Sequence, residues 1–426
     1  MKKIFTLLVL VLVAVSAMAQ DNRSVWNGKR ELWTRGEGTA ESPYLIESAE
    51  NLAFLSYMCA SGYETYGLHF KLTTDIDLNC SEDRPWNPIG VYLYNDYQTG
   101  CAIAAQTNRS FQGHFDGDGH CIYNLYIEPN SLGGLFGDVI GSRENQIVIE
   151  NIKIMSGTVT SGGIARKVNK VTIRRCANKA DVINETDLAG GIVGEAVTSL
   201  IEECYNEGKV YGKCAGGIVG CSQKATFQNC YNVGDVDGVM ASGGCVGYSY
   251  RVVTVVENSY NVGSISCDSL DAGGLIGIHS DYDSITNSYF LNTCGALGLG
   301  TPKTAEEMRD RSFVDVLNSR TNVWGFDEAF VNQGFPILEN NHAAVDESMS
   351  AMLRIYPNPA NDVLVVECGD ATAIAVYDIL GQCVRQLAVA NVTTKLDVAD
   401  LESGVYILSV SGSNRPSLVT RFVVSR

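Results

Sequence analysis

The sequence predicts an all-β protein: a parallel β-helix (β-solenoid) with short capping helices, followed by a small β-sandwich. Three observations predict this fold. A Gly-Gly motif followed by aliphatic residues recurs through the middle of the chain. A second motif, in which Tyr-Asn follows a small residue, keeps the same period. The last part of the chain instead carries short apolar runs separated by turn residues, which is typical of a sandwich.

The first residues predict a signal peptide over residues 1–19. Lys2 and Lys3 precede the apolar stretch 4–15, and a small-x-small cleavage site follows at 17–19. We therefore expect an exported protein whose mature chain begins at Gln20; the alternative is an uncleaved membrane anchor. No later segment is apolar over the roughly 20 residues that a membrane-spanning helix needs.

The Gly-Gly motif recurs at intervals of 29, 28, 26, 27 and 30 residues. Its copies begin at Gly133, Gly162, Gly190, Gly216, Gly243 and Gly273. Copies of the second motif begin at Cys176, Cys204, Cys230, Ser259 and Ser288, in step with the first. Two motifs that hold one period indicate a solenoid in which each repeat forms one coil.

Each repeat contains short β-prone pieces and no helical apolar pattern, which favours a β-helix over a helical solenoid. About 27 residues accommodate three short strands and three bends, and the repeats predict roughly six or seven coils. Glycine is expected to supply the positive φ at the bends. The recurring asparagines are expected to form a ladder that bonds backbone groups left unpaired there. These asparagines are Asn178, Asn206, Asn232 and Asn261.

Helices are predicted at both ends of the solenoid, where they would cap exposed strand edges. Ser48 precedes the helical stretch 49–61, which ends at Gly62. Thr304 and Glu307 form a capping-box pattern that opens a second short helix.

Three segments follow the signal peptide. Residues 20–340 contain the repeats and their caps, and the polar, acidic stretch 341–353 is predicted to be a linker. Residues 354–426 are predicted to form a seven-stranded Ig-like sandwich.

The repeats resemble GLUG motifs, which occur in large bacterial surface proteins and adhesins. The resemblance rests on segments 190–194 and 216–220, both Gly-Gly-Ile-Val-Gly. Residues 86–90 resemble the usual lead-in to such arrays, and residues 334–338 resemble their usual end. The resemblance covers roughly residues 37–340 and implies a right-handed parallel β-helix at a cell surface.

The C-terminal segment resembles the sorting domain (type A) of type IX secretion system cargo. The matching segments are Tyr356-Pro357-Asn358-Pro359, 377–381 and 401–406. The resemblance assigns sorting-motif roles to Pro357, Asn358, Pro359, Gly381, Leu401, Gly404 and Tyr406. It implies a Gram-negative cell, transport through the periplasm and across the outer membrane by the type IX machinery, and removal of the domain by a sortase-like peptidase. The protein would then be secreted or attached to the cell surface.

The charge and the cysteines exclude several classes of function. The chain has a formal net charge of −17 and no basic cluster, so nucleic acid is an unsuitable partner. Its 14 cysteines include no C-x-x-C pair, and its five histidines lack metal-ligand spacing. We predict no metal site and no cofactor, and cysteines that either pack as free thiols or form disulfides. Residues 116–119 resemble the start of a calcium loop, but the closing Glu is missing, so an Asp-Gly turn is the better interpretation.

The expected function is adhesin-like binding of a glycan or a host protein. Each coil resembles its neighbours and none carries an added pair of carboxylates or a base, so we predict that the protein is not an enzyme. The alternatives are a carbohydrate-active β-helix lyase or hydrolase and a ligand-free structural surface protein. Tyr205, Tyr231 and Tyr260 either shield the core or line a sugar-binding face, and shielding is favoured. The recurring cysteines suit a ladder of small packed side chains better than a metal site.

Overall fold

The computed structural model describes residues 23–90, 109–250, 253–339, 354–367, 371–378, 383–388, 393–412 and 418–425. The predicted signal peptide (1–19) and linker (341–353) lie outside these residues. The chain divides into two compact units, one of residues 23–344 and one that contains residues 345–426.

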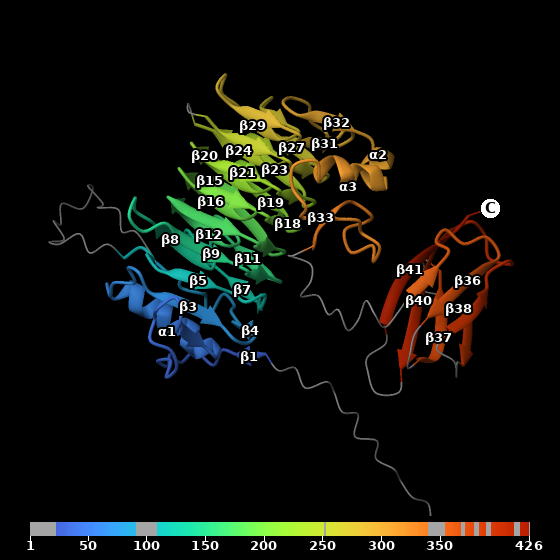
Figure 1. Ribbon diagram of the computed structural model, residues 1–426, viewed down its shortest axis with the longest axis horizontal. Helices are drawn as coiled ribbons and strands as arrows, with labels where there is room; N and C mark the ends of the chain where they lie inside the picture. Colours follow the sequence, from blue (N-terminus) through green and yellow to red (C-terminus); the bar gives the residue numbers. More distant parts are fainter. Residues whose placement is uncertain are drawn as a thin grey trace, which may run out of the picture. The chain divides into compact units, whose positions relative to one another are not determined.

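The first unit is a parallel β-solenoid, as the period predicts, and its strands form four sheets (Figure 1). It has about eight turns, which is more than the six or seven that the repeats predict, because coils before the first repeat belong to the same stack. The ten-stranded sheet contains β1 (Ser24–Val25), β4 (Ile76–Asp77), β6 (Cys121–Tyr123), β10 (Lys153–Ile154), β14 (Ala177–Asn178), β18 (Tyr205–Asn206), β22 (Tyr231–Asn232), β26 (Tyr260–Asn261), β31 (Tyr289–Leu291) and β32 (Thr301–Lys303). The nine-stranded sheet contains β2 (Tyr44–Ile46), β3 (His69–Leu72), β5 (His114–Asp116), β9 (Ile147–Glu150), β13 (Val171–Arg174), β17 (Leu200–Glu202), β21 (Thr226–Gln228), β25 (Val255–Glu257) and β30 (Ser284–Thr286).

The other two sheets of the solenoid are shorter. The seven-stranded sheet contains β7 (Leu125–Tyr126), β11 (Gly157–Val159), β15 (Asp181–Gly190), β19 (Val210–Gly216), β23 (Val236–Gly243), β27 (Ile265–Cys267) and β28 (Ala272–Gly273). The six-stranded sheet contains β8 (Phe136–Ile140), β12 (Ala165–Asn169), β16 (Val193–Val197), β20 (Val219–Gln223), β24 (Val246–Ser249) and β29 (Ile276–Ile278).

A coil in the middle of the stack contains four strands, so the prediction of three was wrong. The extra strand is the Tyr-Asn pair of the second motif, which forms the two-residue strands of the ten-stranded sheet. A residue with positive φ lies two positions before each such strand and turns the chain: Arg175, Glu203, Asn229 and Asn258, with φ between 50° and 52°. A two-residue strand is too short to give an alternating pattern, so the sequence does not reveal it.

The repeat glycines are not the positive-φ bends that the sequence predicts. Gly190, Gly191, Gly216 and Gly217 are absent from the described residues with positive φ, whereas non-glycine residues occupy that region at the bends. Glycine is required at these positions because successive coils approach one another too closely to leave room for a side chain. A Cβ on Gly191 would lie 2.1 Å from the carbonyl oxygen of Gly217 in the next coil, which is far inside van der Waals contact.

The predicted asparagine ladder is confirmed. The Nδ2 of Asn178 donates to Oδ1 of Asn206 at 2.9 Å, Asn206 to Asn232 at 2.9 Å, and Asn232 to Asn261 at 2.8 Å. Each Nδ2 also donates to the backbone carbonyl two residues further on. All four side chains are fully buried, so each amide needs these partners inside the stack.

The core is built from apolar side chains that stack in parallel register. In the nine-stranded sheet, one row of fully buried side chains is paired from coil to coil: Ile149, Ile173, Ile201, Phe227 and Val256. Because neighbouring strands lie about 4.8 Å apart, equivalent side chains contact one another along the whole stack.

Helix α1 (Ala49–Ala60) forms in the first coil, where the sequence predicts it. The Ser48 side chain accepts a hydrogen bond from the backbone N–H of Asn51, and Gly62 with φ 81° follows the C-cap Ser61. Near the other end of the solenoid, α2 (Ala305–Arg309) opens with the predicted capping box of Thr304 and Glu307. Helix α3 (Arg311–Leu317) follows directly.

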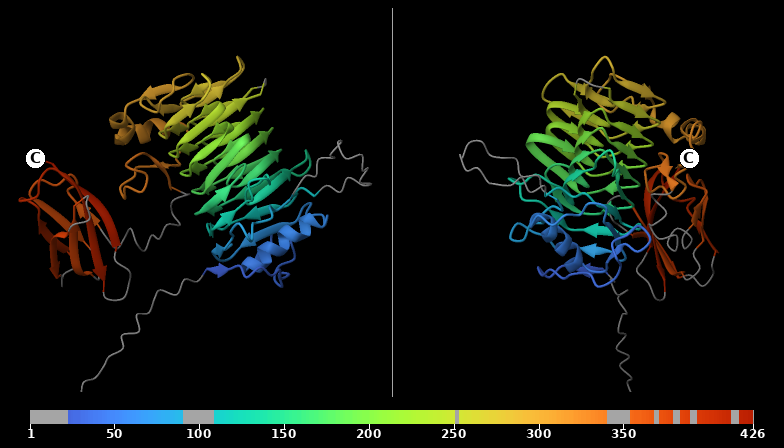
Figure 2. Two further views of the ribbon diagram at one scale, coloured as in Figure 1. Left: turned by 180° about the vertical axis from the view of Figure 1, so that it is seen from behind. Right: turned by 60° about the vertical axis from the view of Figure 1, so that its left-hand side comes forward.

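These two C-terminal helices do not act as the end cap that the sequence predicts. They begin a strap, residues 304–339, which also contains β33 (Trp324–Gly325) paired antiparallel with β34 (Ile337–Leu338). The strap runs back along the flank of the solenoid and packs on the tyrosines of the ten-stranded sheet (Figures 1 and 2). Its buried residues Met308, Phe313, Leu317 and Trp324 make this contact.

The second unit is an antiparallel sandwich, as predicted. One sheet contains β35 (Arg354–Tyr356), β36 (Val363–Glu367) and β39 (Thr393–Asp397). The other contains β37 (Ala371–Tyr377), β38 (Cys383–Ala388), β40 (Gly404–Gly412) and β41 (Leu418–Val424). Leu364 and Leu396 from the first sheet share one core with Val376, Leu408 and Phe422 from the second.

Candidate functional site

The segment Tyr356–Pro359 of the second unit is bound to the last strand. The Tyr356–Pro357 and Asn358–Pro359 peptide bonds are cis. Oδ1 of Asn358 accepts a hydrogen bond from the backbone N–H of Val423 at 2.8 Å. Ala360 and the end of β41 then exchange two backbone hydrogen bonds, from Ala360 N to Val423 O at 2.8 Å and from Ser425 N to Ala360 O at 3.0 Å. The exposed Pro-Asn-Pro segment is therefore presented beside the C-terminal strand.

The second group of predicted sorting residues shapes the turn that leads into β40. Leu401 is buried and Gly404 begins the strand. The hydroxyl of Tyr406 donates to the carbonyl of Glu402 at 3.0 Å, and its ring stacks on Phe422 with 5.7 Å between ring centroids. Gly381 lies outside the described residues.

The structure brings these two groups to the same strand. Asn358 contacts Val423 and Tyr406 contacts Phe422, and both partners belong to β41. The sequence motifs do not mark β41. Its alternating Phe422 and Val424, both buried, are the only signal that it forms a strand, and nothing in that signal indicates which segment it contacts.

The recurring cysteines form a buried ladder, as favoured from the sequence. The backbone N–H of Cys176 donates to Sγ of Cys204 at 3.4 Å, and the serines continue the pattern, with Cys230 N donating to Ser259 Oγ at 3.0 Å. Burial raises the pKa of the Cys204 thiol well above its usual value and that of Cys245 to about 12. Among the described cysteines no disulfide forms. A protonated, buried thiol is unsuited to nucleophilic chemistry.

The tyrosine row shields the core and does not form an open sugar-binding face. The rings of Tyr205, Tyr231 and Tyr260 stack with centroid distances of 4.9 Å and 5.2 Å, and all three are buried. Trp324 of the strap lies over them, 5.5 Å from Tyr260. Tyr260 is also tied to the strap through its hydroxyl, which accepts a hydrogen bond from Asn332 Nδ2 at 2.8 Å.

The segment that resembles a calcium loop is an Asp-Gly turn. Oδ1 of Asp116 accepts from the backbone N–H of Asp118 at 2.9 Å and from Asn151 Nδ2 at 2.7 Å. Lys71 Nζ lies 3.0 Å from Asp118 Oδ1. Within the part of the chain that the structure describes, no three His, Cys, Asp or Glu side chains are placed to hold a metal ion.

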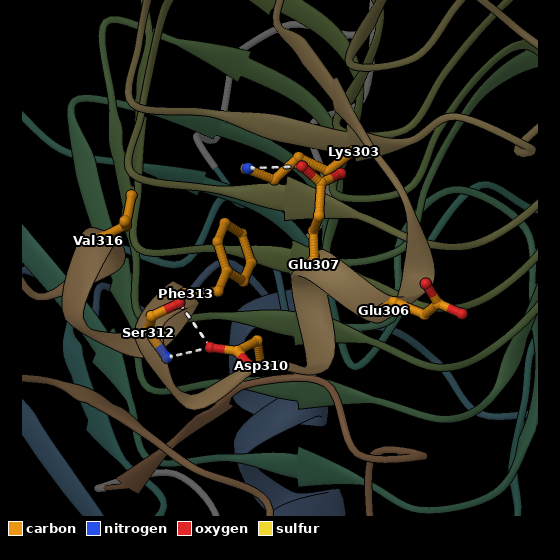
Figure 3. A pocket seen from close by; sticks show the side chains of 7 residues that line it. All are labelled: Lys303, Glu306, Glu307, Asp310, Ser312, Phe313 and Val316. Atoms are coloured by element: carbon orange, nitrogen blue, oxygen red, sulfur yellow. Dashed lines mark hydrogen bonds and ion pairs between the residues drawn. The ribbon is translucent and has the colours of Figure 1, made fainter.

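A cavity of about 400 Å³ lies beside α2 and α3 in the strap (Figure 3). Two of its three carboxylates, Glu307 and Asp310, serve as helix caps, and the third is Glu306 in the first turn of α2. The backbone N–H of Thr304 holds the pKa of Glu307 below its usual value, and the hydroxyl and backbone N–H of Ser312 do the same for Asp310. A general acid for glycoside cleavage needs a raised pKa, so neither of the two capping carboxylates suits that role.

The outer face of the nine-stranded sheet carries a continuous polar row. Its members occupy one register position in eight successive strands: Lys71, Asp116, Glu150, Arg174, Glu202, Gln228, Glu257 and Thr286. All are partly exposed. Opposite charges pair along the row, as where Arg174 Nε lies 2.8 Å from Glu150 Oε2. At about 4.8 Å per strand the row is roughly 34 Å long, which suits an extended ligand.

Comparison with known proteins assigns the second unit. Residues 354–425 match the family model of the secretion system C-terminal sorting domain. The chain is also similar in structure to a protein of Bacteroides ovatus that is provisionally named an immunoglobulin A1 protease. That match has a TM-score of 0.55 and 21% identity, and covers 72% of this chain and 95% of the other. At this identity the likeness shows the fold.

Two curated relatives share shorter stretches with the chain. Halomucin of Haloquadratum walsbyi is 28% identical over 164 residues, which is 38% of this chain and 2% of halomucin. A protein of Evansella cellulosilytica, provisionally named a Gly-rich membrane protein, is 34% identical over 154 residues, 35% of this chain and 15% of that protein. The chain thus spans only a small part of the length of either relative.

The fold and the C-terminal match together define a class of protein. It is a secreted or cell-surface β-solenoid protein whose C-terminal domain sorts it through the type IX secretion system. Among the described residues, no helix has the length and apolar character needed to cross a membrane.

Proposed function

We propose that the protein binds a glycan or a protein at the bacterial surface in the manner of an adhesin, through the polar row of the nine-stranded sheet. The observation that carries the proposal is this row, in which eight partly exposed polar side chains repeat in register. The strap packs on Tyr205, Tyr231 and Tyr260 of the neighbouring ten-stranded sheet, whereas the side chains of the polar row stay partly exposed. The resemblance of the repeats to GLUG motifs of surface proteins and adhesins supports the same function.

An array of glycans and host matrix proteins tests the binding. We expect the mature protein to bind at least one ligand, and Arg174→Ala with Glu202→Ala to weaken that binding about tenfold, because both side chains lie in the middle of the row. Lys167→Ala with Glu195→Ala is the matched control, since this ion pair lies on the six-stranded sheet. An equal loss of binding affinity in both double variants would contradict the proposal. So would enzymatic turnover of a polysaccharide that is abolished by substituting one carboxylate.

The sorting residues complete the proposed function. The secretion machinery would recognise the surface around β41, which is presented by the sorting residues Pro357, Asn358, Pro359, Gly381, Leu401, Gly404 and Tyr406. A sortase-like peptidase would then remove the domain. Deleting residues 354–426 should retain the protein in the periplasm, as measured by labelling intact cells. Normal surface display of the truncated protein would overturn this assignment.

A further inference from the structure

A second, polar cavity of about 190 Å³ lies at the corner between the nine-stranded and ten-stranded sheets. Three residues of the corner with positive φ form its floor: Asn229, Asn258 and Asn287. The polar row supplies Glu257 and Thr286 next to them, and the strap supplies Arg320 and Thr321. The cavity therefore needs three successive coils and the strap, and no single repeat contains it.

The floor is held rigid by hydrogen bonds. The Nδ2 of Asn287 donates to Oδ1 of Asn258 at 2.6 Å, and the Nδ2 of Asn258 donates to Oδ1 of Asn229. The strap fixes the same amides, because Asn258 Nδ2 also donates to Thr321 Oγ1 at 3.2 Å. Asn229 and Asn258 are each 4% exposed, so their orientation is set before any ligand arrives.

The groups that face this floor are open for binding. Within the described residues, no hydrogen bond or ion pair engages the carboxylate of Glu257, the hydroxyl of Thr286 or the guanidinium of Arg320. At the same corner two coils earlier, the charged side chains bind one another. Arg175 Nε donates to Asn151 Oδ1 at 2.7 Å, and the Arg175 guanidinium forms an ion pair with Glu150. Beside the strap, the corner combines a fixed amide floor with an acid and a base that no described residue engages.

We infer that this cavity is a subsite for one neutral hexopyranose ring of a glycan, an inference that rests on the proposed function. A carboxylate accepts hydrogen bonds from two adjacent sugar hydroxyls, and a guanidinium donates to hydroxyl and ring oxygens. The volume is below the roughly 300 Å³ at which drug-sized pockets begin, which limits the site to one ring. The Glu257 carboxylate repels an acidic sugar, so a neutral hexose is favoured over a uronic acid.

Titration calorimetry of the mature protein with methyl glycosides tests the inference. The probes are the methyl pyranosides of glucose, galactose, mannose and glucuronic acid. We expect at least one neutral glycoside to bind, with the glucuronide weaker, and Glu257→Gln and Arg320→Met each to reduce the affinity about tenfold. Glu195→Gln and Arg311→Met are the matched controls, since Glu195 pairs with Lys167 on another sheet and Arg311 with Glu328 in the strap. Thermal unfolding checks that all four variants fold.

Three results separate the inference from the proposed function. A loss confined to Glu257→Gln and Arg320→Met supports both. Neutral glycosides that bind all variants equally, or bind none while the array still shows a ligand, overturn the subsite and leave the proposed function standing. No binding by the mature protein in either experiment overturns both.

Discussion

Lys153 is an unusual residue in the solenoid, because its ammonium group is buried without a partner. It lies in the outward row of the ten-stranded sheet, in register with Cys121 and Ala177. The side chain is 3% exposed, and its Nζ has no hydrogen-bond acceptor among the described residues. Burial lowers the pKa of Lys153 below its usual 10.5, and the positive charge of Lys179 lowers it further, against the raising effects of Cys121 and Asp75.

Replacing Lys153 by Met should therefore stabilise the protein. Removing a buried, unpaired ammonium group is expected to raise the free energy of unfolding by about 1–3 kcal/mol at pH 7. The unfolded chain binds the lysine proton up to pH 10.5, whereas the folded protein releases it at lower pH, so the natural protein gains stability as the pH rises through that window. The advantage of Met should shrink over the same window.

Urea unfolding at pH 7 and at pH 10 measures this difference. Lys167→Met is the control, because Lys167 Nζ pairs with Glu195 Oε2 at 2.7 Å and its loss brings no stabilisation. A Lys153→Met protein that is less stable at pH 7 would show that the ammonium group is satisfied in solution.

The repeat glycines give a second prediction at this scale. Gly191→Ala should destabilise the solenoid by more than about 2 kcal/mol, because its Cβ would meet the backbone of the next coil at 2.1 Å. Gly67→Ala is a matched control that has φ 70° but no atom within 4 Å of the new Cβ, and it should cost about 1 kcal/mol. Denaturant unfolding compares the two, and a larger loss at Gly67 would show that φ, and not close approach, selects glycine.

At the scale of elements, local signals were predictable and distant contacts were not. The capping box at Thr304 and the N-cap Ser48 predicted α2 and α1, because these signals lie within four residues of the helix they open. The position of the strap was not predictable, since it depends on Trp324 meeting tyrosines of coils about 60 to 120 residues earlier in the chain. A periodic pattern shows that the tyrosines share a face, but it carries no information on what covers them.

In the candidate sites, too, local sequence motifs were predictable and contacts between distant segments were not. The Tyr356–Pro359 motif was visible in the sequence, while its hydrogen bond to Val423 was not. The cavity beside Arg320 was missed entirely, because the corner asparagines occur in sequence as ordinary turn residues and acquire their role only when stacked against the strap.

Trp324→Ala should release the strap. The side chain is 2% exposed and its ring packs on Tyr231 and Tyr260, so truncation is expected to cost about 3–5 kcal/mol of local stability. Limited proteolysis should then cut within residues 304–339 while the β-sheet circular dichroism persists. Val316→Ala, on the partly exposed side of α3, serves as control. Unchanged cleavage in the Trp324 variant would show that the helices alone hold the strap.

For the whole molecule, two separate cores imply two folding units. The core of the sandwich includes Leu408 and Phe422, and none of the described solenoid residues belongs to it. Calorimetry of the intact protein should therefore resolve two transitions, of which Leu408→Ala lowers one and Gly191→Ala the other. A single transition that both substitutions shift equally would contradict this independence.

The head-to-tail chain of Asn178, Asn206, Asn232 and Asn261 has a mechanical consequence for a stretched solenoid. A pulling force along the stack axis acts on the coil boundaries in series, and each boundary between these coils contains one such amide link beside its backbone hydrogen bonds. Since a repeat contains 26 to 30 residues, each rupture would release on the order of 90 Å of chain. The solenoid would then lengthen under traction in steps of similar size, and an adhesin of the kind proposed would yield gradually.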